Sequence, residues 1–231
     1  MSIFAIADLH LSMAPETEKP MDVFGDRWFN HAERIRENWC RCVCENDTVI
    51  VAGDISWGLK LEEARYDLDW VDGLPGHKVL LKGNHDLWWA GITRLNNMYD
   101  SITFLQNDAI RIEDVWICGS RGWITPDDDD FTEADEKIYN RELLRLEASL
   151  NSVPSGEKII GFLHFPPVSN AERFSGFMQL FEDYGVKQVY YGHLHGEEAF
   201  RRAMQGNFHG TEYRLISADY VNCCPVLIKE G

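Results

Sequence analysis

The sequence predicts an α/β sandwich in which helices flank β-sheets. Short apolar runs rich in β-branched or aromatic residues recur along its 231 residues, and each run is bounded by turn-forming or charged residues. Stretches with a helical spacing of apolar residues lie between several of these runs, so strands and helices alternate through most of the chain. The runs are apolar throughout, which is typical of strands that are covered on both faces. We therefore expect helices against the sheets.

Seven runs have the length and composition of strands. In chain order they are IFAIA (3–7), TVIVA (48–52), KVLLK (78–82), VWICG (115–119), KIIGFL (158–163), KQVYYG (187–192) and PVLIK (225–229). Helices are predicted at 30–45, 61–72, about 131–150 and 171–184. The first opens with Asn30 and Glu33 in the arrangement of a capping box. No repeat or long linker divides the chain, so we expect a single domain over residues 1–231.

Composition and charge argue against several classes of protein. Hydrophobic residues make up 45% and charged residues 26% of the chain, close to the average of globular proteins. The N-terminus, MSIFAIADLHLS, lacks the basic region and cleavage site of a signal peptide, and no run approaches the roughly 18 apolar residues of a membrane span. The six cysteines follow neither a zinc-binding nor a disulfide pattern and are expected to be reduced. We therefore expect a cytoplasmic protein.

The charge of the chain bears on its partners. The formal net charge is −16 and the sequence pI is about 4.8. A surface this acidic repels polyanions, which argues against a protein whose main work is to hold long DNA or RNA. A small phosphorylated substrate is compatible with it, provided that the site is locally positive. The sequence does not indicate an oligomeric state.

Side chains of the metal-ligand type follow five of the predicted strands. They occur in Asp8-Leu9-His10, Gly53-Asp54, Gly83-Asn84-His85-Asp86, the lone His164, and Gly192-His193-Leu194-His195. In sheets of this kind, ligands bind beyond the carboxyl ends of the strands. Where the backbone is extended, residues i and i+2 project to one side. The pairs Asp8/His10 and His193/His195 would then each aim two side chains at one point.

The pooled side chains have the chemistry of a metal centre. They comprise two carboxylates, one amide and four imidazoles, with His85 as a further imidazole, and they include no thiolate. Nitrogen and oxygen ligands together suit divalent transition metals such as Mn, Fe, Co or Zn. Seven ligands exceed the needs of one tetrahedral ion but suffice for two ions that share a carboxylate. The residues therefore predict a site for two metal ions.

The motifs DLH, GD, GNHD, a later lone histidine and GHLH resemble those of the calcineurin-like metallophosphoesterases in order and spacing, from residue 8 to residue 196. The resemblance implies a four-layer α/β/β/α sandwich of two mixed β-sheets flanked by helices, with a dinuclear site at the sheet edges. It implies one metal held by Asp8, His10, Asp54 and His195, and a second held by Asp54, Asn84, His164 and His193. Asp54 would then bridge the two ions.

The same resemblance places His85 off the metals, facing the substrate, where it would stabilise the transition state or protonate the leaving oxygen, with Asp86 orienting its ring. Many family members continue the second motif as Gly-Asp-x-x-Asp, whereas Trp57 occupies the last position here.

Arg121 follows the strand 115–119 and is either a clamp for a substrate phosphate or an ion-paired arginine. The acidic run 127–130 is either a solvated lead-in to the next helix or a loop beside the site.

These observations predict a metal-dependent phosphoesterase. It would hydrolyse a small phosphomonoester or phosphodiester with water activated by two divalent ions, of which Mn, Fe and Zn are the candidates. The alternatives are a nuclease, a nucleotide or lipid pyrophosphate hydrolase of the same family, and an inactive metal-binding scaffold. The acidic charge argues against the nuclease, and GNHD has a histidine where we expect an arginine in the lipid-directed enzymes.

Overall fold

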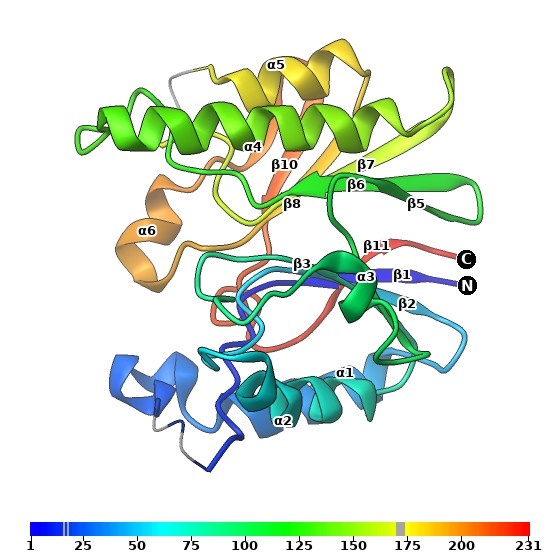
Figure 1. Ribbon diagram of the computed structural model, residues 1–231, viewed down its shortest axis with the longest axis vertical. Coiled ribbons are helices and arrows are strands. Elements are labelled where there is room, and N and C mark those ends of the chain that lie inside the picture. The colour runs from blue at the N-terminus through cyan, green and yellow to red at the C-terminus, as the bar shows by residue number, and fades with distance from the viewer. Residues whose placement is uncertain (16, 18, 170–173) are drawn as a thin grey trace. The chain divides into compact units, whose positions relative to one another are not determined.

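Two mixed β-sheets, one in each of two units, carry the fold of this computed structural model (Figure 1). The structure describes residues 1–231 except 16, 18 and 170–173. Unit 1 comprises Met1–Phe104 and Ile216–Gly231, and unit 2 comprises Leu105–Leu215. The predicted α/β class, with two mixed sheets and associated helices, is confirmed.

The sheet of unit 1 has five strands in the order β11-β1-β2-β3-β4. Their bounds are Val226–Lys229, Ile3–Ile6, Thr48–Ala52, His77–Leu81 and Ile102–Phe104. β11 is antiparallel to β1, and the other neighbours are parallel. Ile6 lies opposite Val51, and Ala52 lies opposite Leu81. β1, β2 and β3 therefore end level with one another, and the loops that carry the first three motifs leave the same edge.

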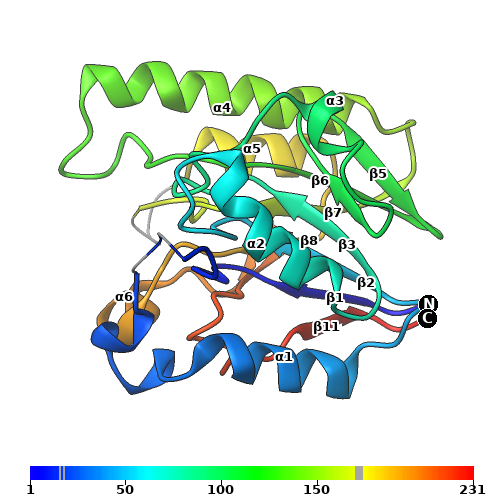
Figure 2. The same cartoon turned by 60° about the horizontal axis from the view of Figure 1, so that its bottom comes forward.

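Two helices of unit 1, α1 (His31–Cys42) and α2 (Leu61–Asp72), lie on the same face of this sheet (Figures 1 and 2). Ile35 and Trp39 of α1 and Leu68 of α2 are fully buried in one apolar core with the strand residues Val49 and Val51. The short α3 (Ile92–Leu95) and the 3₁₀ turns η1 (Met21–Phe24) and η2 (Asp26–Trp28) complete the unit.

The predicted start of α1 is wrong in its capping. Asn30 has a left-handed backbone (φ 50°), and its side chain makes no capping hydrogen bond. Its own N–H instead donates to Asp22 Oδ1 at 3.1 Å. The helix also ends at Cys42, before the expected residue 45, because Val43 is extended. A tertiary contact with η1 therefore replaces the local capping box.

The sheet of unit 2 has six strands in the order β5-β6-β7-β8-β10-β9. Their bounds are Ala109–Ile112, Val115–Ser120, Lys158–Leu163, Gln188–Tyr191, Thr211–Leu215 and Gly206–Phe208. The four central strands are parallel, and the two edge strands are antiparallel to their neighbours. Ser120 lies opposite Leu163, which lies opposite Tyr191. β6, β7 and β8 thus end together, as their counterparts in unit 1 do.

Helices α4 (Glu133–Asn151) and α5 (Gly176–Asp183) lie side by side along one face of this second sheet (Figures 1 and 2). A capping box between Thr132 and Asp135 begins α4, and the Ser175 side chain caps α5. The helix predicted from residue 171 begins at Gly176, and residues 171–173 lie outside the described residues. The remaining helix, α6 (Gly196–Arg202), follows the GHLH motif directly.

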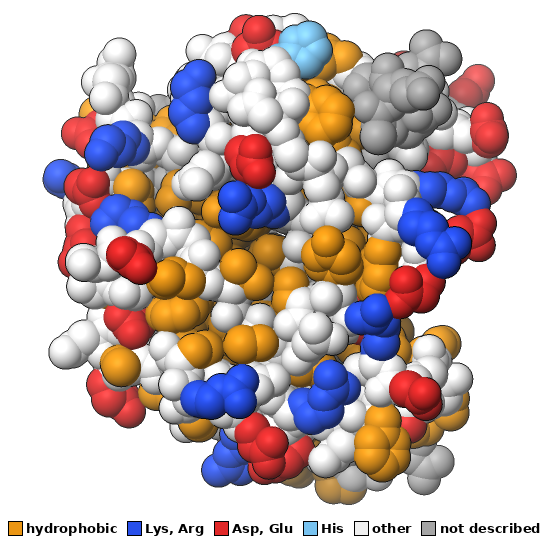
Figure 3. All heavy atoms as spheres, turned by 180° about the vertical axis from the view of Figure 1, so that it is seen from behind, with side chains coloured by type: hydrophobic (Ala, Val, Ile, Leu, Met, Phe, Trp, Pro, Cys, Tyr) orange, Lys and Arg blue, Asp and Glu red, His pale blue; other side chains and the backbone are white. Residues whose placement is uncertain are grey.

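The surface mixes charges of both signs. On the face drawn in Figure 3, Lys and Arg side chains are interspersed with Asp and Glu, and hydrophobic side chains lie among them. Such a face offers no continuous basic track for a nucleic-acid backbone. Among the described residues, every helix is too short or too polar to span a lipid bilayer.

Candidate metal centre

The first two motifs meet at the edge of the unit 1 sheet through their backbones. The N–H of Asp8 donates to the carbonyl of Gly53 at 2.9 Å, and the N–H of His10 donates to the carbonyl of Asp54 at 3.0 Å. Asp8, His10 and Asp54 are almost fully buried, with exposed fractions of 0%, 3% and 1%. These three polar side chains therefore lie together where water hardly reaches them.

The backbone at these residues differs from the expected extended form. Asp8, His10 and Asp54 all have left-handed conformations, with φ of 60°, 44° and 51°. The prediction that Asp8-x-His10 aims its side chains from an extended strand end is therefore wrong. Each such residue costs about 1–3 kcal/mol, so the surrounding hydrogen bonds must hold it in place. Strained residues of this kind cluster at functional sites.

Asp54 is the centre of the unit 1 arrangement. Its Oδ1 accepts a hydrogen bond from the backbone N–H of His85 at 2.8 Å. Its Oδ2 lies 3.8 Å from His10 Nε2 and 4.0 Å from His85 Nε2. A Cβ atom on Gly83 would collide with the Asp54 side chain and backbone nitrogen. Glycine at position 83 therefore allows the loop after β3 to approach the loop after β2.

Asp86 joins the loop after β2 to the loop after β3. Its fully buried carboxylate accepts hydrogen bonds from the backbone N–H groups of Ile55 (2.9 Å), Ser56 (3.2 Å) and Gly83 (2.7 Å). The indole N–H of Trp88 donates to it as well, at 3.1 Å. The structure thus gives Asp86 a part in holding the loops, in addition to the predicted part beside His85.

His85 and Asn84 occupy the rim of this arrangement. Asn84 is half-buried between Gly83 and His85, and the His85 side chain is 43% exposed. A side chain with this exposure can meet a substrate from solvent, unlike the nearly buried His10. Unit 1 therefore brings together six of the predicted site residues, namely Asp8, His10, Asp54, Asn84, His85 and Asp86.

Several aromatic residues of unit 1 that the motifs do not contain surround His10. Its ring stacks on Trp57, with centroids 4.8 Å apart and planes at 21°, and meets the edge of Trp28 at 5.5 Å. His31 lies against the same loop, with Nε2 3.3 Å from the His10 carbonyl oxygen. Burial lowers the pKa of His31, which favours its neutral form. A tryptophan three residues after Asp54, where many family members have an aspartate, was the available sequence signal.

The predicted ligands of unit 2 lie at the ends of β7 and β8. His164 is fully buried, and its carbonyl accepts the N–H of Gly192 at 3.1 Å. The rings of His164 and His193 are 5.2 Å apart and nearly perpendicular. His193 is left-handed (φ 71°) whereas His195 is extended (φ −130°). The spacing His-x-His thus produces two different backbone conformations, contrary to a uniformly extended strand end.

Arg121, at the end of β6, is anchored inside unit 2. Its guanidinium donates to the fully buried Glu142 of α4 at 3.1 Å and lies 4.5 Å from the centre of the Trp123 ring. Arg145 donates to the same carboxylate oxygen at 2.8 Å. Burial lowers the pKa of Arg121, and the Glu142 carboxylate opposes this shift. The Arg121 carbonyl in turn accepts the N–H of His164 at 3.1 Å.

Glu142 is a residue that sequence reasoning missed. It lies on the buried stripe of α4 with Tyr139, Leu146 and Leu150. A carboxylate at this position of an apolar helical face was a readable signal, because buried charges are almost always paired. Its contact with Arg121 ties α4 to the end of β6.

The chemistry of the donor set fits metal ions. Among the described residues, unit 1 contributes Asp8, His10 and Asp54 as side chains that could hold a metal, and unit 2 contributes His164, His193 and His195. Buried carboxylates are costly unless a cation or hydrogen bonds compensate them. Imidazole and carboxylate ligands together match divalent transition metals.

Comparison with known proteins decides the family. The sequence matches the family described as calcineurin-like phosphoesterase over residues 1–197. The chain belongs to this family. It is therefore a phosphoesterase of a metal-dependent kind, a hydrolase that acts on phosphoester bonds of phosphorylated substrates. None of the curated proteins matches its sequence.

Two solved structures are similar to this phosphoesterase in fold. A protein of unknown function from Aquifex aeolicus has 16% identity and a TM-score of 0.53, covering 98% of this chain and 95% of its own. The phosphopantetheinyl hydrolase PptH from Mycobacterium tuberculosis has 15% identity and a TM-score of 0.54, covering 94% and 88%. At this identity, both similarities establish the fold alone.

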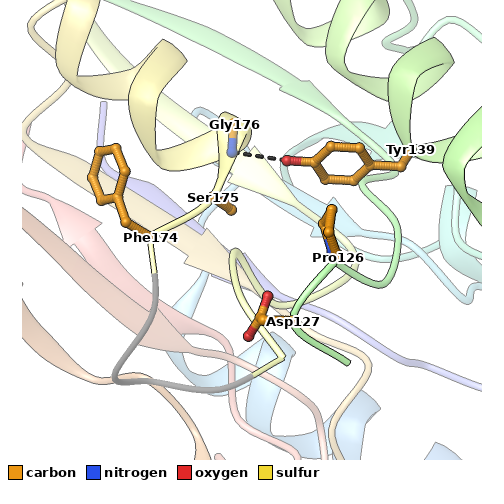
Figure 4. A pocket seen from close by; sticks show the side chains of 6 residues that line it. All are labelled: Pro126, Asp127, Tyr139, Phe174, Ser175 and Gly176. Carbon is orange, nitrogen blue, oxygen red and sulfur yellow. Dashed lines mark hydrogen bonds between the residues drawn. The ribbon is translucent and has the colours of Figure 1, made fainter. Parts of the chain in front are cut away.

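The acidic run of the phosphoesterase begins beside a pocket of unit 2 with a volume of about 410 Å³. Figure 4 shows its lining residues, with the Gly176 N–H donating to the Tyr139 hydroxyl at 2.8 Å. Asp127 lines the pocket and accepts a 2.5 Å hydrogen bond from Thr125. The N–H of Asp130 donates to Asp128, so the run forms a turn before α4. The choice between a solvated lead-in and a loop beside the site stays a prediction.

Proposed function

We propose that this phosphoesterase hydrolyses a small phosphomonoester or phosphodiester with two divalent transition-metal ions, of the Mn, Fe or Zn type. The observation that carries the proposal is the position of Asp54. Its buried Oδ2 lies 3.8 Å from His10 Nε2, beyond hydrogen-bond distance. Two atoms that each lie about 2.1 Å from one tetrahedral ion are separated by roughly 3.4 Å. The spacing is therefore closer to that of two ligands of one ion than to that of a hydrogen bond.

The proposed ligands follow the family pattern. Asp8, His10, Asp54 and His195 would hold one ion, and Asp54, Asn84, His164 and His193 the other. The family match runs through both units, which supports a single functional domain over residues 1–231. Two divalent ions bring four positive charges against the two negative charges of Asp8 and Asp54. The resulting excess would attract phosphate to a chain whose net charge is −16.

The chain's own residues would act on the bound ester as follows. Metal ions, when bound, supply an activated water and neutralise charge on the phosphoryl oxygens. His85 is exposed enough to reach the leaving oxygen and would donate a proton to it. Asp86 would keep His85 in place by holding the loops on either side, through its bonds to Ile55 and Gly83.

Arg121 is proposed as the third catalytic residue. A guanidinium has five N–H donors, and Glu142 accepts from one of its terminal nitrogens at 3.1 Å. This anchor leaves further donors to stabilise negative charge on a phosphate at the end of β6. The anchored, planar cation would lose little freedom on binding.

The net charge of the chain supports a small substrate, and its free cysteines support a reducing location. The net charge of −16 disfavours long nucleic acids as substrates. All six cysteines are free, which is expected in the cytoplasm, where thiols stay reduced. The inactive scaffold is the competing proposal, and it differs from the enzyme only in turnover.

The test combines metal analysis with assays on aryl phosphate mono- and diesters. We expect the wild type to bind about two transition-metal ions per chain and to hydrolyse at least one of the two esters. Asp54→Asn should lose metal together with activity. His85→Ala should keep its metal and lose rate by roughly 10²–10⁴-fold, as expected for a missing general acid.

The controls are the exposed residues Asp114 and His209, whose side chains are 55% and 61% exposed. Asp114→Asn and His209→Ala should retain both metal and rate. Full activity in Asp54→Asn or His85→Ala contradicts the assignment. A wild type that binds metal but hydrolyses neither ester favours the scaffold.

A further inference from the structure

Trp57 stands on a loop that is fixed from several sides. The N–H of Trp57 donates to the carbonyl of Leu11 at 2.9 Å. The preceding residues Ile55 and Ser56 donate to Asp86, and the N–H of Gly58 donates to the Ser56 hydroxyl at 3.0 Å. The indole ring therefore projects from a backbone with little freedom to move.

The ring of Trp57 contacts two histidines of the proposed site. It stacks on His10 at 4.8 Å with nearly parallel planes (21°), and it lies tilted against His85 at 4.4 Å (51°). The rings of His10 and His85 are themselves 5.7 Å apart. The indole N–H points to the sulfur of the buried Met21 at 3.3 Å, which fixes the rotation of the ring. One immobilised indole thus bounds the positions that both imidazoles can take.

The two histidines need this restraint for different reasons. His10 must present a ring nitrogen toward Asp54, whose Oδ2 lies 3.8 Å from His10 Nε2. His85 has a side chain that is 43% exposed, and an exposed imidazole ordinarily samples several rotamers. Close contact with the fixed indole, stacked for His10 and tilted for His85, limits the rotamers that each imidazole can adopt.

We propose that Trp57 is a positioning residue that orients both His10 and His85. The inference rests on the proposed function, in which His10 holds a metal and His85 protonates the leaving group. The Trp57 side chain offers no metal-ligating atom, so its proposed role runs through the two imidazoles that it contacts. Its removal should release His10 and His85 together, which distinguishes it from a residue that only fills space.

The expected effects follow from these two contacts. Hydrogen-bonding partners that orient metal-binding histidines change metal affinity by about 10–100-fold when removed, and the lower end of that range applies to a residue that acts through ring contacts. We expect Trp57→Ala to weaken metal binding by about tenfold or more. At saturating metal, kcat should still fall, because the His85 ring has lost its contact with Trp57, whereas KM should change little. Trp57→Phe keeps a flat ring and should recover most of both quantities.

A matched control is Trp70 of α2, a half-buried tryptophan that packs against the core of the same unit. Trp70→Ala should leave metal affinity and kcat within about twofold of wild type, since surface and partly buried changes away from a site act mainly on stability. Far-UV circular dichroism checks that each variant is folded at the assay temperature.

The measurements use the full chain. Metal affinity is obtained by calorimetric titration of metal-free protein with Zn²⁺, which requires no turnover. Tryptophan fluorescence provides a second signal, because Co²⁺ bound beside His10 should quench Trp57. The quenching amplitude should drop in Trp57→Phe and stay unchanged in Trp70→Phe. The kcat of each variant is then compared at saturating metal.

The outcomes separate the two proposals. If the wild type neither binds metal nor hydrolyses the esters, the proposed function fails and the positioning role fails with it. If the wild type does both, but Trp57→Ala equals Trp70→Ala in metal affinity and kcat, the proposed function stands and the positioning role is refuted. Weaker metal binding and lower kcat in Trp57→Ala, with recovery in Trp57→Phe, supports it.

Discussion

Replacing Asp86 tests whether one carboxylate holds the loops after β2 and β3 together. Asp86 is fully buried and accepts four hydrogen bonds, from three backbone N–H groups and the indole of Trp88. Asp86→Ala removes all four acceptor contacts. A buried donor left without a partner costs about 1–3 kcal/mol, and water entering the vacated space would satisfy some of the four. We therefore expect a loss of about 3–5 kcal/mol in the free energy of unfolding.

The isosteric variant Asp86→Asn separates charge and geometry from volume. Its amide oxygen can still accept from Ile55, Ser56 and Trp88, which share Oδ1 in the wild type. Its amide nitrogen would face the N–H of Gly83, donor against donor. We expect an intermediate loss of about 1–3 kcal/mol.

The assay is urea unfolding of the metal-free protein, followed by tryptophan fluorescence at constant pH. Metal is removed with a chelator so that altered metal binding does not enter the measured stability. The slope of the free energy against urea should be unchanged in both variants. Asp114→Ala, an exposed carboxylate beside Lys158, is the control and should cost less than about 0.5 kcal/mol. An Asp86→Ala loss no larger than that of the control would refute the reasoning.

Two further predictions concern close approach and burial. Gly83→Ala should lower the metal content and destabilise the fold by about 1–3 kcal/mol, because the added Cβ collides with Asp54. Gly91→Ala is the control, since an added Cβ there meets open space, and it should change neither metal content nor stability. Equal metal content in the two variants would contradict the argument. Burial raises the pKa of Asp67 above its ordinary 3.8, so its favourable contribution is full below that value and is lost as pH rises through the raised pKa. The unfolding free energy of wild type minus that of Asp67→Asn should therefore fall as pH rises from about 4, and a constant or rising difference would count against it.

Local sequence patterns predicted most of the central strands closely. The expected runs 48–52 and 158–163 coincide with β2 and β7, and the helix 61–72 coincides with α2. Whether an apolar run between turn-forming residues becomes a strand depends mainly on those few residues, so the local sequence predicts it. The edge strands β4, β5 and β9 and the inner strand β10 were missed, because a short segment without a continuous apolar run becomes a strand only through the neighbour that it pairs with.

For the candidate site, the sequence by itself determined the residue types and the strand ends that carry them. Aspartate, asparagine and histidine after apolar runs are local facts, and the carboxyl ends of parallel strands lie on one edge whatever the details. The family match over residues 1–197 agrees with the family that these motifs indicated.

Only the tertiary structure decided how those residues are held. The left-handed backbones of Asp8, His10, Asp54 and His193 contradict the extended form that the spacing suggested. Asp86 binds Ile55, 31 residues away, Glu142 anchors Arg121, and Trp57 stacks on His10. Each of these contacts joins segments that are distant in the chain. Sequence spacing specifies directions only within a regular element, whereas the orientation of a loop residue is set by whatever packs against it.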